Sequence, residues 1–241
     1  MIDFNAIFTI DGIISLITLT FLEIILGIDN IIFISIVSSK LPKNQQKKAR
    51  ATGLFLALLF RVALLFSISW IIGLKDPFAY IGSFGVTGKD IILISGGLFL
   101  IIKTIIEIAE KINSTQKTEK NYSALTLQSA ILQIVFLDII FSFDSLLTAV
   151  GLVRNVLLMI CAIVLSMIAM LAFSEKVSDF INKHPTVKML ALAFLVMIGL
   201  VLLSEGLHFH VNKGYVYVAL LFSLGVELLN MTYRSKSHMR D

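Results

Sequence analysis

The sequence predicts an all-α fold, a polytopic membrane bundle of about seven transmembrane helices. Two observations lead to this fold class. Hydrophobic residues make up 57% of the 241 positions and charged residues only 15%, whereas a soluble domain has about 45–50% apolar and about 25% charged residues. The apolar residues also gather into separate runs, each near the roughly 20 residues that cross a bilayer as a helix. We therefore expect a single transmembrane domain over residues 1–241.

Each predicted span is an apolar run between polar stretches, and its few polar residues distinguish it from the others. The first and fourth each hold two acids, and the second holds Arg61. Lys103 and Glu107 form an i,i+4 pair near the end of the third. The fifth has no charged residue, the sixth has none before Glu205 at its end, and the seventh carries Glu227 and Asn230. In order, the spans cover about 12–38, 51–74, 91–108, 124–152, 156–173, 189–205 and 215–233.

Lysine and arginine divide unequally between the two sides that these spans define. The loops after the first, third and fifth spans, with the C-terminal tail, hold 14 of the 20 basic residues, and the opposite side holds 4. The remaining two, Arg61 and Lys103, lie within spans. Because basic loops stay in the cytoplasm, we expect the N-terminus outside and the C-terminus in the cytoplasm. The net charge of +4 then reflects membrane orientation, and no nucleic-acid partner is expected.

Two twelve-residue stretches, 21–32 and 136–147, repeat one pattern 115 residues apart. Five of the twelve aligned positions are identical, and both acids fall in register. The acids are Glu23 and Asp29 in the first stretch and Asp138 and Asp144 in the second. Acids inside apolar spans are costly and are usually functional, so a registered match between four of them indicates a real repeat.

The predicted topology makes the two stretches antiparallel, because the first span enters from outside and the fourth from the cytoplasm. This indicates an inverted 3+3 repeat, with residues 12–108 and 124–205 as its halves and an extra helix at 215–233. Inverted repeats place a substrate site near the membrane midplane, where the halves meet.

The spacing of the acids leaves the backbone of the motifs open. Glu23 and Asp29 are six residues apart, a net rotation of about 240° on an ideal helix, so they do not share a face. Either the helix breaks between them, which Gly27 favours, or it is continuous and each acid serves a different surface. Asn30 adds an amide that can cap a helix or coordinate an ion. The second stretch has Ser142 where the first has Gly27.

Four acids with amide and hydroxyl neighbours form a set of hard oxygen ligands. Such ligands suit Mn²⁺, Mg²⁺ or Ca²⁺ better than metals that prefer nitrogen or sulfur. Carboxylates close together hold protons until a cation arrives, so metal binding would release protons. The alternative is that the acids pair with Arg61 and polar side chains only for folding. The neighbours that we expect to help the acids are Asn30, Ser142 and Ser145.

Other polar residues have supporting roles or none. Arg61 lies near the midplane of the second span, and we expect it to pair with one of the acids. Glu227 and Asn230 are three apart and share a helix face, so they either join the site or bind a neighbouring helix. His208 and His210 lie in an outer loop, where we expect no specific role.

Residues 22–34 with 40–42 resemble the first motif of the TerC family of bacterial integral membrane proteins. Residues 138–145 with 148–151 resemble its second motif, and 225–230 also look familial. The resemblance covers the whole chain. The chain is similar to the short, single-domain branch of the family. The resemblance implies seven spans, a transporter built on inverted repeats and, by name, a link to tellurium resistance. The residues that it implies are functional are Glu23, Asp29, Asn30, Asp138, Asp144 and Ser145.

For some members the resemblance implies manganese efflux, and for others membrane-protein assembly or metalation of exported enzymes. We therefore expect a multi-pass bacterial inner membrane protein that exports a divalent cation, Mn²⁺ first, by proton exchange. The alternative is an interaction protein that assists assembly or metalation without transport of its own. The expected partners are a divalent metal ion, protons and the lipid bilayer, and a homo-oligomer or a membrane-protein partner stays open. No cofactor is expected.

We expect no enzymatic activity. An intramembrane aspartyl protease would use two aspartates that share a proton. Here the acids form two matched pairs, and the sequence has no Tyr-Asp or Gly-x-Gly-Asp run.

Overall fold

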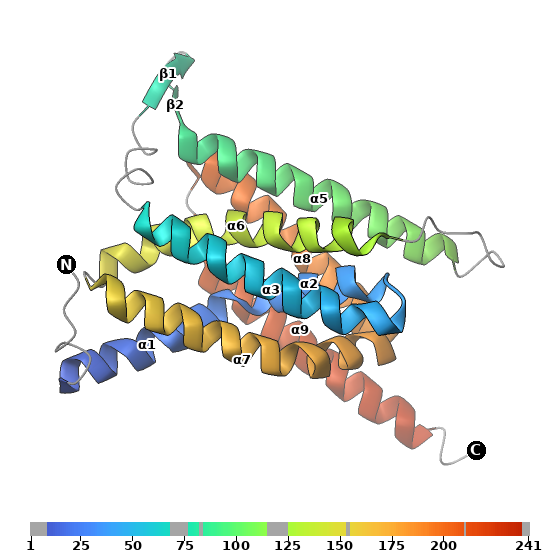
Figure 1. The fold of residues 1–241 in the computed structure, drawn as a ribbon. Helices are drawn as coiled ribbons and strands as arrows, with labels where there is room; N and C mark the ends of the chain where they lie inside the picture. Colours follow the sequence, from blue (N-terminus) through green and yellow to red (C-terminus); the bar gives the residue numbers. More distant parts are fainter. Residues whose placement is uncertain are drawn as a thin grey trace. The chain divides into compact units, whose positions relative to one another are not determined.

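The computed structural model describes residues 9–67, 77–81, 84–114, 125–152, 155–209 and 211–237. Within its helices and strands, the side chains at 81, 84, 114, 144, 147–152, 213 and 234–237 lie outside this description. The described chain is almost entirely α-helical, which confirms the predicted all-α class (Figure 1).

The chain forms two compact units, each built from segments distant in sequence. Unit 1 comprises residues 1–89 and 121–179, and unit 2 comprises 90–120 and 180–241. The elements of unit 1 are α1 (Ile10–Leu26), α2 (Ile28–Ser39), α3 (Lys43–Phe66), β1 (Pro77–Ile81), β2 (Phe84–Thr87), α6 (Leu127–Leu152) and most of α7 (Val156–Lys183). Those of unit 2 are α5 (Gly88–Ser114), α8 (Pro185–Gly206) and α9 (Lys213–Ser237).

The first motif is broken and the second is not. Gly27 separates α1 from α2, with φ −95° and ψ 3°, and the two helices bend by 42°. The Gly27 N–H bonds the carbonyl of Ile24, a tighter closure than an α-helix makes. A Cβ at Gly27 would lie 2.6 Å from the sulfur of Met170 on α7, so a larger residue here would require the methionine side chain to move. The break that the sequence left open is therefore present, whereas α6 passes through Ser142 as one helix.

Helices α3 and α6 run side by side in unit 1 (Figure 1). Ala49 and Ala57 of α3 are fully buried, and small residues at helix spacing let backbones approach closely. The helix begins at Lys43, eight residues before the predicted span, because residues 43–50 are helical but polar. The predicted end near residue 74 falls outside the described residues.

A short β-hairpin stands where the sequence analysis expected only a loop. Strands β1 and β2 pair antiparallel. Phe78 and Tyr80 are exposed, and both are residue types common in strands. The hairpin was missed because its strands are too short for alternation to be distinguished from a loop.

Unit 2 is packed through glycines. A Cβ on Gly97 of α5 would lie 2.8 Å from the carbonyl oxygen of Gly199 on α8, so the two backbones come almost into contact. Such close approach is typical of membrane helices, in which small residues form the interface. Helix α9 packs against α8, and Phe194 and Tyr217 place their ring centroids 6.4 Å apart.

Five described helices are long and apolar enough to cross a membrane: α3, α5, α7, α8 and α9. The bent pair α1 and α2 gives a sixth span if the two cross together, and α6 contributes an apolar stretch at Leu127–Phe143. The chain is therefore a multi-pass membrane protein, and the count of seven stays a prediction. Unit 1 holds the first two predicted spans of each repeat, and unit 2 holds the third of each with α9. The inverted repeat also stays a prediction.

Candidate functional site

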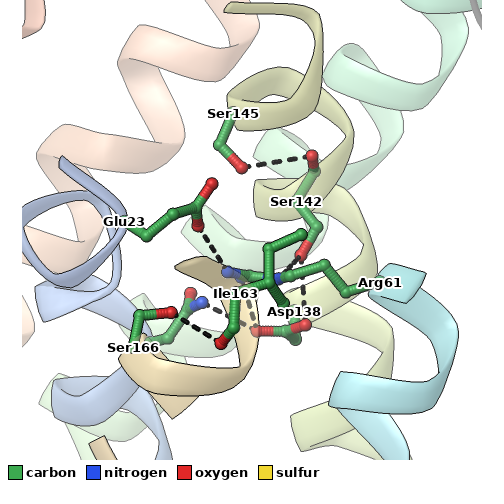
Figure 2. A network of polar contacts seen from close by, with 8 residues as sticks. Glu23, Arg61, Asp138, Ser142, Ser145, Ile163 and Ser166 are labelled. Atoms are coloured by element: carbon green, nitrogen blue, oxygen red, sulfur yellow. Dashed lines mark hydrogen bonds and ion pairs between the residues drawn. The ribbon is translucent and has the colours of Figure 1, made fainter. Parts of the chain in front are cut away.

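A buried polar cluster lies where the two motifs meet α3 inside unit 1 (Figure 2). Arg61 of α3 stands at its centre, with only 3% of the residue exposed. Its Nη1 donates to Glu23 Oε2 at 2.8 Å, and its Nη2 donates to Asp138 Oδ1 at 3.1 Å. Glu23 and Asp138 are the equivalent acids of the two motifs. The predicted pairing of Arg61 with an acid is thus confirmed, and the arginine binds one acid from each motif.

Ser142 completes the environment of the guanidinium. Arg61 Nε donates to Ser142 Oγ at 2.8 Å, and the same hydroxyl donates to Asp138 Oδ2 at 3.1 Å. Asp138 and Ser142 are four residues apart on α6, so they share a face. All three guanidinium nitrogens therefore have partners, as a charge buried in an apolar span requires.

Asn30 joins the cluster from α2, beyond the helix break. Its Nδ2 donates to Asp138 Oδ1 at 2.8 Å. This bond fixes the amide, because the reversed amide would place two acceptor oxygens together. Asn30 is 3% exposed, and its Oδ1 accepts no hydrogen bond from the part of the chain that the structure describes. A buried acceptor without a donor is uncommon, and an amide oxygen is an established ligand for hard cations.

The remaining expected residues differ in how closely they approach this cluster. Asp29 is buried in the first turn of α2, where the positive end of the helix dipole stabilises a carboxylate. Ser145 is buried on α6 and donates to the backbone carbonyl of Ser142 at 3.2 Å (Figure 2). The side chain of Asp144 lies outside the described residues. Glu227 and Asn230 belong to α9 of unit 2, where Glu227 is half-buried and Asn230 is exposed.

Carboxylates alone do not form a metal cage in this arrangement. Within the described ranges, no group of three or more His, Cys, Asp or Glu side chains is placed to hold a metal ion. The geometry explains why, since the guanidinium of Arg61 stands between Glu23 and Asp138. A single site made by all four motif acids stays a prediction.

Ser142 and His208 make contacts that the sequence did not predict. Ser142, considered only as a helper, bonds both Arg61 and Asp138, and its match to Gly27 in the motif alignment was the available signal. In unit 2, His208 Nε2 lies 3.0 Å from Asp90 Oδ2, and His208 has a positive φ of 65°. The signal for this pair was Asp90 just before the third predicted span. His210 lies outside the described residues.

Comparison with known proteins shows close relatives over nearly all of the chain. The UPF0053 protein of Haemophilus influenzae is 45% identical over 222 residues, 92% of this chain and 94% of that protein. The UPF0053 inner membrane protein YgdQ of Escherichia coli is 46% identical over 220 residues, 91% of this chain and 92% of that protein. A UPF0053 protein of Buchnera aphidicola is 46% identical, and this chain spans 43% of its length. No solved structure matches the chain significantly.

The names of these relatives state no chemical reaction. The model of the integral membrane protein TerC family matches residues 8–240, which include both motifs and the buried cluster between them. This chain belongs to the TerC family of integral membrane proteins.

Proposed function

We propose that this protein exports a divalent metal cation across a bacterial inner membrane, and that this cation is Mn²⁺. The observation that carries the proposal is the buried cluster of Glu23, Asp138 and Asn30, in which the Asn30 Oδ1 accepts no hydrogen bond from the described residues. Carboxylates inside apolar spans are costly in free energy, and those that are present usually have a function. The resemblance of the motifs to those of manganese-exporting family members supports the choice of ion, and the name of the Escherichia coli relative supports the membrane.

The proposed ligands are the oxygen-bearing residues of both motifs, and hard cations with six or more oxygen ligands fit such a set. Cation binding needs deprotonated carboxylates, so each ligand carboxyl that holds a proton in the absence of the metal would release it, which couples efflux to proton entry. The ligands are Glu23, Asp29, Asn30, Asp138, Asp144 and Ser145. Arg61 balances the acids.

Alternating access would use the two motifs as a pair. Inverted repeats supply two related arrangements of one site, one open to each side. The broken helix at Gly27 supports this, because transporter sites often lie at interrupted helices. In this proposal the N-terminus is outside and the C-terminus is cytoplasmic, as the excess of basic residues in alternate loops indicates.

Orientation has its own test. A cysteine introduced at Gln45 is expected to be protected from an impermeant thiol reagent in intact cells, and one at Ser83 is expected to be labelled. The opposite pattern would reverse the membrane topology and the proposed direction of the motifs.

Transport is tested with purified protein in proteoliposomes. Wild-type protein should give Mn²⁺ flux that depends on the pH gradient. Asp138→Asn and Glu23→Gln should each abolish it, because each removes one proposed ligand charge. The matched controls are Asp179→Asn and Glu175→Gln, since both acids are exposed on α7 of the same unit. They should keep full flux.

Absence of divalent-cation flux in the wild-type liposomes would refute transport. If, in addition, the Asp138→Asn variant kept full activity in cells, the role in membrane assembly or metalation would take its place.

A further inference from the structure

We infer that Arg61 is a tethered counter-ion that competes with the transported cation, so that the cation binds Glu23 and Asp138 only by displacing the guanidinium. This inference rests on the proposed function and adds to it a regulator of the same site.

Arg61 occupies oxygen lone pairs of both carboxylates. Arg61 donates to Glu23 Oε2 at 2.8 Å and to Asp138 Oδ1 at 3.1 Å, so it contacts both equivalent carboxylates at once. A guanidinium has five N–H donors and no acceptor, so it contributes no ligand to a metal ion. A cation that takes Glu23 Oε2 and Asp138 Oδ1 as ligands needs the oxygens that now face these donors.

The charges of Glu23 and Asp138 also favour one cation at a time. Glu23 and Asp138, the two carboxylates that Arg61 contacts, together balance one divalent cation, so at this pair a cation and Arg61 together would leave an excess positive charge. All three residues are at most 3% exposed, so water screens this excess poorly. Two cations in contact with the same pair of carboxylates are therefore disfavoured, and one must leave when the other arrives.

Ser142 is the third partner of the guanidinium, beside the two acids. Arginine has a long side chain with several rotatable bonds, and among its hydrogen bonds to the described residues one, from Nε to Ser142 Oγ at 2.8 Å, does not involve an acid. Ser142 in turn donates to Asp138 Oδ2. This serine therefore helps to hold the arginine against Asp138, and its loss should loosen the competitor while both acids remain.

For transport, this competition has opposite effects on the binding and on the release of the metal. When the metal leaves, Arg61 returns to the carboxylates and stabilises them in an apolar environment. A competitor of this kind weakens metal binding and speeds metal release. A residue that only positioned the acids would strengthen metal binding, and this difference in sign separates the two roles.

The test measures equilibrium Mn²⁺ affinity and the kinetics of Mn²⁺ flux for purified wild type, Arg61→Gln and Ser142→Ala. Arg61→Gln should bind Mn²⁺ about tenfold more tightly or better, with a lower KM and a lower kcat because release slows. Ser142→Ala should shift affinity in the same direction by less. The control is Ser174→Ala, a buried serine of α7 whose hydroxyl donates to Leu171 O of its own helix, and it should leave affinity unchanged.

Unchanged or weaker affinity in Arg61→Gln and Ser142→Ala, with normal Mn²⁺ binding by wild type, would overturn the inference alone. If Arg61→Gln fails to fold, Ser142→Ala decides by the same sign. Wild-type protein that binds no Mn²⁺ would instead refute the proposed function, and the inference with it.

Discussion

The two motifs share a sequence pattern but not a backbone. In the first, Gly27 breaks the helix with a bend of 42°, and the residues on either side belong to α1 and α2. In the second, α6 runs without a break past Ser142. The equivalent acids Glu23 and Asp138 nevertheless bind the same arginine. Register between the motifs therefore fixes which acids meet, and the local backbone decides which further side chains join them.

The aligned residues Asn30 and Ser145 show the effect of that backbone difference. Asn30 follows the break and donates to Asp138 in the other motif. Ser145 follows no break and donates to a carbonyl of its own helix. The broken copy thus supplies a bond between motifs that the continuous copy does not, and the following variants test this contrast in order of expected effect.

The largest effect is expected where both motifs meet. Arg61→Met leaves two buried carboxylates without their shared cation, which should cost about 3–5 kcal/mol of unfolding free energy. Adding Glu23→Gln should restore part of the loss by removing one of the two charges. Unfolding of the purified variants in detergent measures both values. If neither Glu23→Gln nor Asp138→Asn restores stability, the arginine does not join the motifs energetically.

A smaller effect is expected at the break itself. Gly27→Ala should cost about 1–3 kcal/mol, because its Cβ would lie 2.6 Å from the Met170 sulfur. Pairing it with Met170→Ala should give a smaller loss than the sum of the two single changes, since the shortened side chain makes room for the new methyl group. Additive losses in a double-mutant cycle would argue against this contact as the cause.

The aligned residues Asn30 and Ser145 should then differ in how much they contribute to the free energy of unfolding. Asn30→Ala removes a bond to a buried carboxylate and should cost about 1.5–3 kcal/mol. Ser145→Ala removes a bond within one helix and should cost about 0.5–1 kcal/mol. Thermal unfolding of the two variants side by side compares them. Equal losses would show that the break adds nothing to the contact between motifs.

The sequence predicted the all-α class and the pairing of Arg61 with an acid, because both follow from the cost of charge in an apolar span. It could not decide whether the first motif is broken, since Gly27 is compatible with either backbone and the residue packed closest to it, Met170, lies far along the chain. The polar start of α3 was missed because hydropathy identifies the membrane span, whereas the helix extends beyond it. Ser142 was underrated because a hydroxyl in an apolar run usually bonds its own helix.

The bonds at Asp138 also have a mechanical consequence. Its Oδ1 accepts from Asn30 on α2 and from Arg61 on α3, so a single oxygen of α6 links three helices. A shift of one helical turn, about 5.4 Å, would break both bonds. Asp138 therefore fixes the registers of α2 and α3 against α6 at the same point.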